Sequence, residues 1–83
     1  MIQLNELLHN VNPQNHVRIV FNNHVIYVGR LFRLYKNEVY SEEVRKSKVI
    51  TIETIYWSTC QRSELVIECD EVKKYANWKE DQE

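Results

Sequence analysis

Histidine and cysteine are the residue types that could hold a metal or act as a nucleophile in this 83-residue chain, and their spacing favours neither role. The three histidines, His9, His16 and His24, form no HxH or HxxxH pair, and none lies beside a cysteine. A structural zinc site needs about four grouped ligands. Cys60 and Cys69 form no CxxC pair, and no neighbouring base marks either as a nucleophile. We therefore expect no metal and no cofactor, with Cys69 in the core and Cys60 in a loop.

The paired carboxylates do not indicate acid–base catalysis either. Glu42-Glu43 and Asp70-Glu71 stand where short helices are expected to begin, and acidic residues stabilise that end of a helix dipole. Gly29 is the only glycine, so a glycine-rich phosphate loop is absent. No acyl-transfer, phosphoryl-transfer or nucleotide motif is present. The sequence predicts a protein without catalytic residues.

A binding surface is the remaining way in which these residues could carry a function. The expected strand over 48–57 places Val49, Ile55 and Trp57 on the side opposite its core positions, and Val20 and Val66 can join them. Exposed aromatic and β-branched side chains on a small sheet often mark a contact site. The candidate protein-binding residues are Trp57, Tyr56, Arg62, Val49 and Ile55. The alternative is that the crossover or a closing helix covers this face and that Trp57 packs inside.

A second group of residues has the composition of a nucleic-acid contact. Basic and aromatic residues alternate in this group, which could neutralise phosphates and stack bases; its members are Arg30, Phe32, Arg33, Tyr35 and Lys36. Residues 30–48 carry six bases against three acids, although the whole chain has a net charge of −1. No RNP, KH, helix-turn-helix or zinc-finger pattern accompanies them. Nucleic-acid binding is therefore the alternative to protein binding.

The elements that must position these residues follow from hydrophobic periodicity. Residues 2–9 predict a short amphipathic helix with Asn10 as a left-handed cap, and residues 16–21 and 25–28 predict a hairpin around Asn22-Asn23. Residues 31–47 predict an irregular crossover with at most one helical turn, capped by Ser41. Strands are expected over 48–57 and 64–70, and a closing helix over 71–79 precedes an acidic tail, 79–83, that should fray.

Together these elements predict one α+β domain over residues 1–83. Its expected sheet has four antiparallel strands in two hairpins, with helices on one face. The predicted core places six strand residues beneath three leucines of the first helix: Ile19, Phe21, Ile50, Ile52, Leu65 and Ile67 under Leu4, Leu7 and Leu8. We expect self-association as a homodimer, either through one of the two sheet edges, neither of which is protected by proline, or through the face of Val49, Ile55 and Trp57.

Composition points to a cytoplasmic location. The chain is 43% hydrophobic and 28% charged, which is ordinary for a globular protein. No apolar run approaches 18 residues, and no basic segment precedes an apolar one, so we expect neither membrane insertion nor secretion. The two cysteines are then expected to be reduced.

The order of these motifs resembles a known group of proteins. Ile2-Gln3-Leu4-Asn5-Glu6-Leu7-Leu8, then Val11-Asn12-Pro13, Val17-Arg18-Ile19-Val20, Tyr27-Val28-Gly29 and Leu65-Val66-Ile67-Glu68 are similar to segments of small accessory proteins of Gram-positive phages and integrative elements. The crossover 31–47 and the closing helix depart from the shorter form of that group.

The resemblance implies a non-enzymatic accessory protein whose partner is a host or phage protein. Some small phage proteins of this kind inhibit host defence systems, including CRISPR nucleases. The resemblance carries over no site residue, because the matching motifs are structural.

Overall fold

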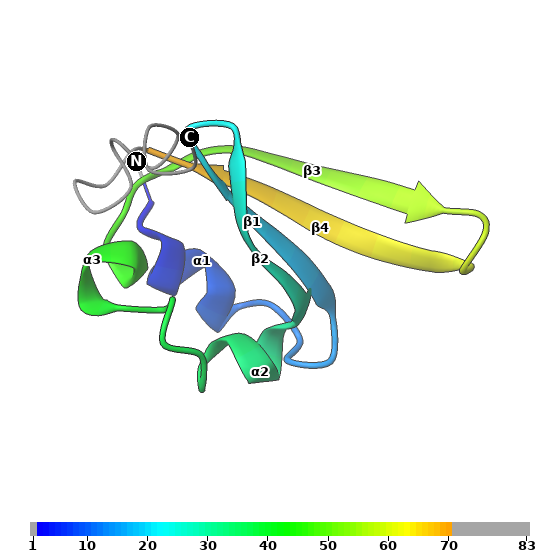
Figure 1. Cartoon of the computed structure of the whole chain (residues 1–83), viewed down its shortest axis with the longest axis horizontal. Coiled ribbons are helices and arrows are strands. Elements are labelled where there is room, and N and C mark those ends of the chain that lie inside the picture. Colours follow the sequence, from blue (N-terminus) through cyan, green and yellow to red (C-terminus); the bar gives the residue numbers. More distant parts are fainter. Residues whose placement is uncertain (1, 71–83) are drawn as a thin grey trace, which may run out of the picture.

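The computed structural model describes residues 2–70, which form a four-stranded sheet with three short helices (Figure 1). The elements are α1 (Leu4–His9), β1 (His16–Phe21), β2 (His24–Arg30), α2 (Leu31–Leu34), α3 (Glu42–Arg45), β3 (Val49–Trp57) and β4 (Arg62–Cys69). The three helices lie on one face of the sheet, so the predicted α+β class is confirmed. The helix expected over 71–79 and the tail 79–83 lie outside the described residues. Within residues 2–70, no helix has the length and apolar character needed to cross a membrane.

The sheet is mixed, so the prediction of four antiparallel strands is wrong at its centre. Strand order is β2-β1-β4-β3, with β1 and β4 parallel and the two outer pairs antiparallel. β1 and β4 carry most of the buried strand residues: Val17, Ile19 and Phe21 of β1 lie beside half-buried Leu65 and buried Ile67 and Cys69 of β4. Pairing these two strands in the middle gathers their apolar side chains under the helices, which a sheet with β3 in the middle would not do.

The first hairpin turns at the two asparagines that the sequence indicated. Asn22 and Asn23 both have positive φ, 48° and 64°, and β1 pairs with β2 on either side of them. Asparagine tolerates this left-handed backbone better than most residues, so this prediction is confirmed. The register shifts between Ile19 and Val20, where a bulge bends the hairpin.

The N-terminal helix is shorter than predicted and ends differently. α1 starts at Leu4 because Gln3 pairs with Lys48 as an isolated bridge, and the Gln3 backbone N–H donates to the Glu6 carboxylate at 3.0 Å. Asn10 has φ −99°, so it is not the left-handed cap that was expected. Its N–H instead bonds the carbonyls of the last turn. Leu4 and Leu8 of this helix are fully buried.

The crossover contains two separate helical turns, where at most one was expected. Leu31 and Leu34 of α2 are fully buried and fix that turn against β2. α3 begins as predicted at Ser41, whose Oγ accepts a hydrogen bond from the Val44 N–H at 3.3 Å. Hydrophobic burial in α2, which propensity alone does not report, accounts for the extra turn.

The predicted core is confirmed on β1 and β4 and wrong on β3. Ile19, Phe21 and Ile67 are fully buried, and Leu65 and Leu7 pack against them partly exposed.

Ile50 and Ile52, by contrast, are 52% and 47% exposed. Ile50 is the unpaired residue at the register shift between Val49 and Thr51, and beyond it β3 runs past the area that the helices cover (Figure 1). Val49, expected on the outer face, is buried in the core at 7% exposure. A register shift between Val49 and Thr51 turns Val49 inward, so the alternation of β3 breaks at its first residues.

Candidate protein-binding site on the β3–β4 hairpin

The β3–β4 hairpin projects from the body of the molecule and ends in the turn that contains Gln61 (Figure 1). Cross-strand register assigns its residues to two faces. Trp57 pairs with Arg62 and Ile55 with Glu64 on the face turned away from the helices. Tyr56 pairs with Ser63 on the other face, which continues into the core at Ile67.

An ion pair supports the Trp57 ring from below. The Arg18 guanidinium carbon lies 6.0 Å from the centroid of the Trp57 ring, and Arg18 Nε donates to Glu64 Oε1 at 2.7 Å. The Glu64 side chain is only 1% exposed, so Arg18 supplies the charge that compensates for the burial of this carboxylate. Trp57, Arg18 and Glu64 come from three adjacent strands, and we call them the Trp57 stack.

Arg18 and Glu64 are functional candidates that the sequence analysis missed. The alternation of each strand puts both residues on its outer side, where charged residues normally need no partner. The only signal in the sequence is that Arg18 and Glu64, which carry opposite charges, occupy outward positions of two strands. This signal becomes informative only once β1 and β4 are known to be neighbours, because Arg18 then lies two residues out of direct register with Glu64.

The five protein-binding candidates do not form one continuous surface. Trp57 is 39% exposed and Tyr56 62% exposed, but they lie on opposite faces of the hairpin. Arg62 is exposed beside Trp57, and Ile55 is half-buried between Trp57 and Glu53. Val49 belongs to the core and cannot contribute to a surface. The structure therefore brings together Trp57, Arg62 and Ile55.

Positive charge extends from this face across β1. His16 lies between Arg30 of β2 and Glu64 of β4. Burial, followed by the nearby charges of Arg62 and Arg30, lowers the pKa of His16 below its usual value. The imidazole is therefore neutral at pH 7, and the positive charge of this part of the face comes from the arginines.

The nucleic-acid candidates at 30–36 lie at the end of β2 and around α2, and several of them make contacts within the protein. An Arg30 guanidinium N–H donates to Gln14 Oε1 at 2.9 Å, and the Arg33 guanidinium lies 5.7 Å from the centroid of the Phe32 ring. The Tyr35 ring packs on Tyr40, with 5.6 Å between centroids.

The Tyr35 hydroxyl donates to the Leu8 carbonyl at 3.4 Å. Lys36 is exposed. The Phe32 and Tyr35 rings are thus engaged locally, which reduces the surface they offer to a stacked base.

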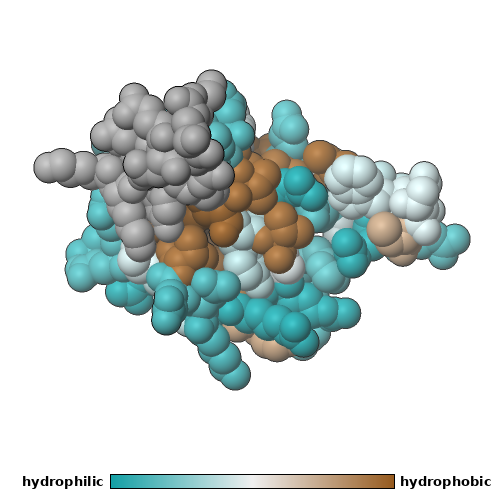
Figure 2. Space-filling model, in the orientation of Figure 1, coloured by the Kyte–Doolittle hydropathy of each residue, from teal (hydrophilic) through white to brown (hydrophobic). Residues whose placement is uncertain are grey.

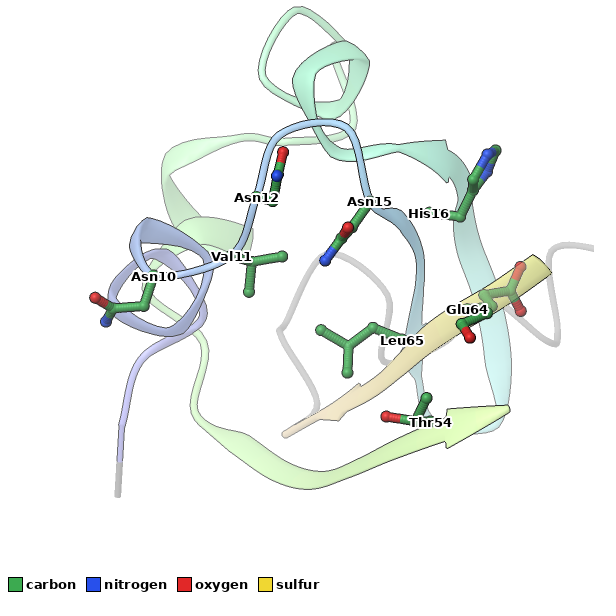
Figure 3. Close-up of a pocket in the computed structure, with 9 residues that line it drawn as sticks. Asn10, Val11, Asn12, Asn15, His16, Thr54, Glu64 and Leu65 are labelled. Atoms are coloured by element: carbon green, nitrogen blue, oxygen red, sulfur yellow. The ribbon is translucent and has the colours of Figure 1, made fainter. Parts of the chain in front are cut away.

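A pocket of about 270 Å³ lies between the loop 10–15 and the inner face of the hairpin (Figure 3). Asn15, Val11 and Leu65 face this space, with Thr54 at its border, while the His16 side chain points away from it. The lining residues supply amides, hydroxyls and apolar groups, while the Glu64 carboxylate points to the other side of β4 from Leu65 and is held by Arg18. This arrangement offers hydrogen bonds but no acid, base or nucleophile positioned for a reaction.

The two thiols differ in exposure, with Cys69 buried and Cys60 exposed. Burial raises the pKa of the Cys69 thiol to about 11, so the thiol is protonated and unreactive at neutral pH. Cys60 is exposed in the hairpin turn, where its Sγ lies 3.7 Å from the Thr59 hydroxyl. Within residues 2–70, no three His, Cys, Asp or Glu side chains gather as a metal ion would require.

No protein-family model matches the chain, and no curated protein and no solved structure shows significant similarity to it. These comparisons assign the chain to no family.

Proposed function

We propose that this protein is a non-enzymatic protein-binding module that contacts its partner with the outer face of the β3–β4 hairpin, formed by Trp57, Arg62 and Ile55. The observation that carries the proposal is the Trp57 stack. A tryptophan ring 39% exposed on a projecting hairpin is held in place by a guanidinium that is itself fixed by a buried carboxylate.

The energetics of protein interfaces support this use of the ring. Tryptophan and arginine are enriched among the residues that dominate binding energy, and here they lie directly opposite each other on adjacent strands. A ring that is already held loses little conformational freedom when a partner covers it. Hairpin projection lets a partner reach the ring without contacting the helices (Figure 1).

The class of partner follows from the resemblance to small accessory proteins of Gram-positive phages and integrative elements. We propose a host protein of the cytoplasm as the partner, and an inhibitory role against a defence protein such as a CRISPR nuclease. The overall net charge of −1 agrees with a protein partner better than with a phosphate backbone.

The test is affinity capture from lysates of Gram-positive bacteria, with and without nuclease, using the wild type, Trp57→Ala and the control Val25→Ala. Val25 is 41% exposed on the edge strand β2 and lies opposite Val20, away from Arg18 and the hairpin tip. A captured protein should survive nuclease treatment, be retained by Val25→Ala and be lost or reduced at least about tenfold by Trp57→Ala.

Thermal melting must accompany the capture. We expect Trp57→Ala to stay folded and to melt about 5 °C lower, because its ring packs on one guanidinium rather than in the core. Collapse of the fold would mean that Trp57 is a structural residue, and the proposal would be withdrawn.

Nucleic-acid binding is the second candidate, since Arg30 and Arg62 both lie on the face of the sheet that carries Trp57. It predicts capture that disappears on nuclease treatment and falls steeply with salt. The variants Arg33→Gln and Lys36→Gln would then weaken capture as much as Trp57→Ala does. If they leave it unchanged, the basic group 30–36 has no part in binding.

A further inference from the structure

The free edge of β3 carries an inference that does not depend on the proposed function. β3 is an outermost strand of the sheet, and within residues 2–70 no strand pairs with its outer edge between Ile50 and Trp57. Alternate residues of such a strand direct their N–H and C=O groups outward, where they can bond another strand. We propose that the occupant of this edge is β3 of a second copy of the chain, paired antiparallel about a two-fold axis.

The side chains of β3 provide little protection against such pairing. Natural edge strands usually carry lysine, proline or several charges. β3 contains one charged residue, Glu53, and no proline among its nine residues. Ile52 and Tyr56 are 47% and 62% exposed on one face, and Trp57 is 39% exposed on the other.

The start of the edge is already occupied, which limits the register. The Val49 N–H donates to the Ile2 carbonyl at 2.9 Å, and Gln3 is bridged to Lys48. A second strand can therefore cover only the stretch from Ile50 onward. Residues directly opposite each other in an antiparallel pair have their side chains on the same face of the sheet. With a two-fold axis between two copies of β3, this requires one residue to lie opposite its own copy. The free stretch from Ile50 to Trp57 is centred between Glu53 and Thr54, so the axis passes through one of these two residues.

Charge decides between these two centres. An axis at Glu53 sets two carboxylates directly opposite each other, which is destabilising. An axis at Thr54 sets Ile52 against the partner subunit's Tyr56, and by symmetry this pair forms twice. It also sets Trp57 against the partner subunit's Thr51 on the other face. We therefore assign the register with Thr54 at the axis, which joins two four-stranded sheets into one continuous sheet.

Disulfide trapping tests this register directly. Cysteines placed opposite each other across an antiparallel pair have Cα atoms about 4.5–5.5 Å apart, within disulfide range. In a Cys60→Ser background, which removes the exposed thiol, Thr54→Cys should form a covalent dimer under mild oxidation. A mixture of the Thr51→Cys and Ile55→Cys variants, whose cysteines would lie opposite each other about an axis at Glu53 and which keep its carboxylate, should form little heterodimer. Cross-linking of that mixture in preference to Thr54→Cys would overturn the register.

Sedimentation equilibrium tests the assembly itself. The wild type should show a reversible species of twice the 10.1 kDa monomer mass. Ile52→Lys and Tyr56→Lys should weaken association about tenfold or more, whereas Val25→Lys, at a position 41% exposed on the other edge strand, should not. A 10.1 kDa species alone at concentrations up to about 1 mM would overturn the proposal. Partner capture by Trp57→Ala and dimerisation by Ile52→Lys are separate readouts, so either proposal can fail without the other.

Discussion

At the scale of single residues, Glu64 shows how a charge can be buried on the outer face of a small sheet. Its carboxylate is 1% exposed although the helices cover only the opposite face. Neighbouring strands supply the cover, and Arg18 supplies the compensating charge through a 2.7 Å hydrogen bond. The aromatic ring of Trp57 then lies over the same guanidinium. One arginine thus links a buried charge to the exposed ring that we propose as the contact residue.

Removing Arg18 should cost more stability than neutralising Glu64. Arg18→Met leaves a buried carboxylate without its partner, and we expect a loss of about 3 kcal/mol in the free energy of unfolding at pH 7. Glu64→Gln should cost less, because the amide oxygen can still accept from Arg18. Urea titration of both single variants and of the double variant measures the coupling. A loss below about half a kcal/mol for Arg18→Met would contradict the importance of the ion pair.

At the scale of elements, β3 belongs to the core at one end and to the surface along most of its length. Val49 is buried, while residues 50–54 beyond it are all exposed. Figure 2 shows the apolar surface in the middle of the molecule giving way to paler surface along the hairpin. The helices are only four to six residues long, so they cover β1, β2 and the start of the hairpin and no more. A projecting hairpin is the consequence.

The paired residues Ile52 and Ile67 should therefore respond differently to truncation. Ile67 is fully buried, and Ile67→Ala should cost about 2–5 kcal/mol. Its cross-strand neighbour Ile52 is 47% exposed, and Ile52→Ala should cost less than about 1 kcal/mol. Denaturant titration of the two variants at a concentration where the protein is monomeric makes the comparison. Equal losses would show that something covers Ile52.

The Asn22-Asn23 turn should tolerate glycine and reject a β-branched residue. Asn23 has φ 64°, a conformation that costs most side chains about 1–2 kcal/mol. Asn23→Val should lower the free energy of unfolding by about that amount, and Asn23→Gly should leave it within about half a kcal/mol of the wild type. Thermal melts of both variants check this expectation. A neutral Asn23→Val would mean that the turn readily adopts another conformation.

At the scale of the whole molecule, packing of the helices on the sheet also sets how stability depends on pH. Burial raises the pKa of Cys69 from 9.0 to about 11 and that of Tyr40 from 10.0 to about 12. Both groups hold their protons more tightly in the folded protein. Their contribution to stability is therefore complete below pH 9 and is lost as the pH rises through these ranges.

The free energy of unfolding should accordingly fall between about pH 9 and 11 through Cys69, and further above pH 10 through Tyr40. Cys69→Ala should be less stable than the wild type at pH 8, because it opens a cavity, yet its free energy of unfolding should fall less between about pH 9 and 11. For Tyr40→Phe, the free energy of unfolding should fall less above pH 10. Denaturant titrations at half-unit pH intervals give these slopes. Unchanged slopes in both variants would show that neither group titrates with unfolding.

The sequence by itself determined the elements whose cause is local. Asn22-Asn23 turns because asparagine accepts positive φ, Ser41 caps because its hydroxyl reaches the Val44 N–H, and β1 alternates because every second residue is apolar. Each of these depends on residues a few positions apart, so a linear pattern is sufficient to predict it. The candidate ring at Trp57 was found in the same way, from its type and its place at the end of a strand.

Tertiary structure decided everything that depends on which strands become neighbours. The parallel pairing of β1 with β4 is not encoded in any one segment, because it depends on where the crossover returns the chain and on how much apolar surface each arrangement buries. That pairing brings Arg18 to Glu64 and both to Trp57. The reach of the helices likewise decides that Val49 is buried and Ile52 exposed. The sequence could not predict this difference, because a strand pattern specifies the face of each residue but not whether anything lies over it.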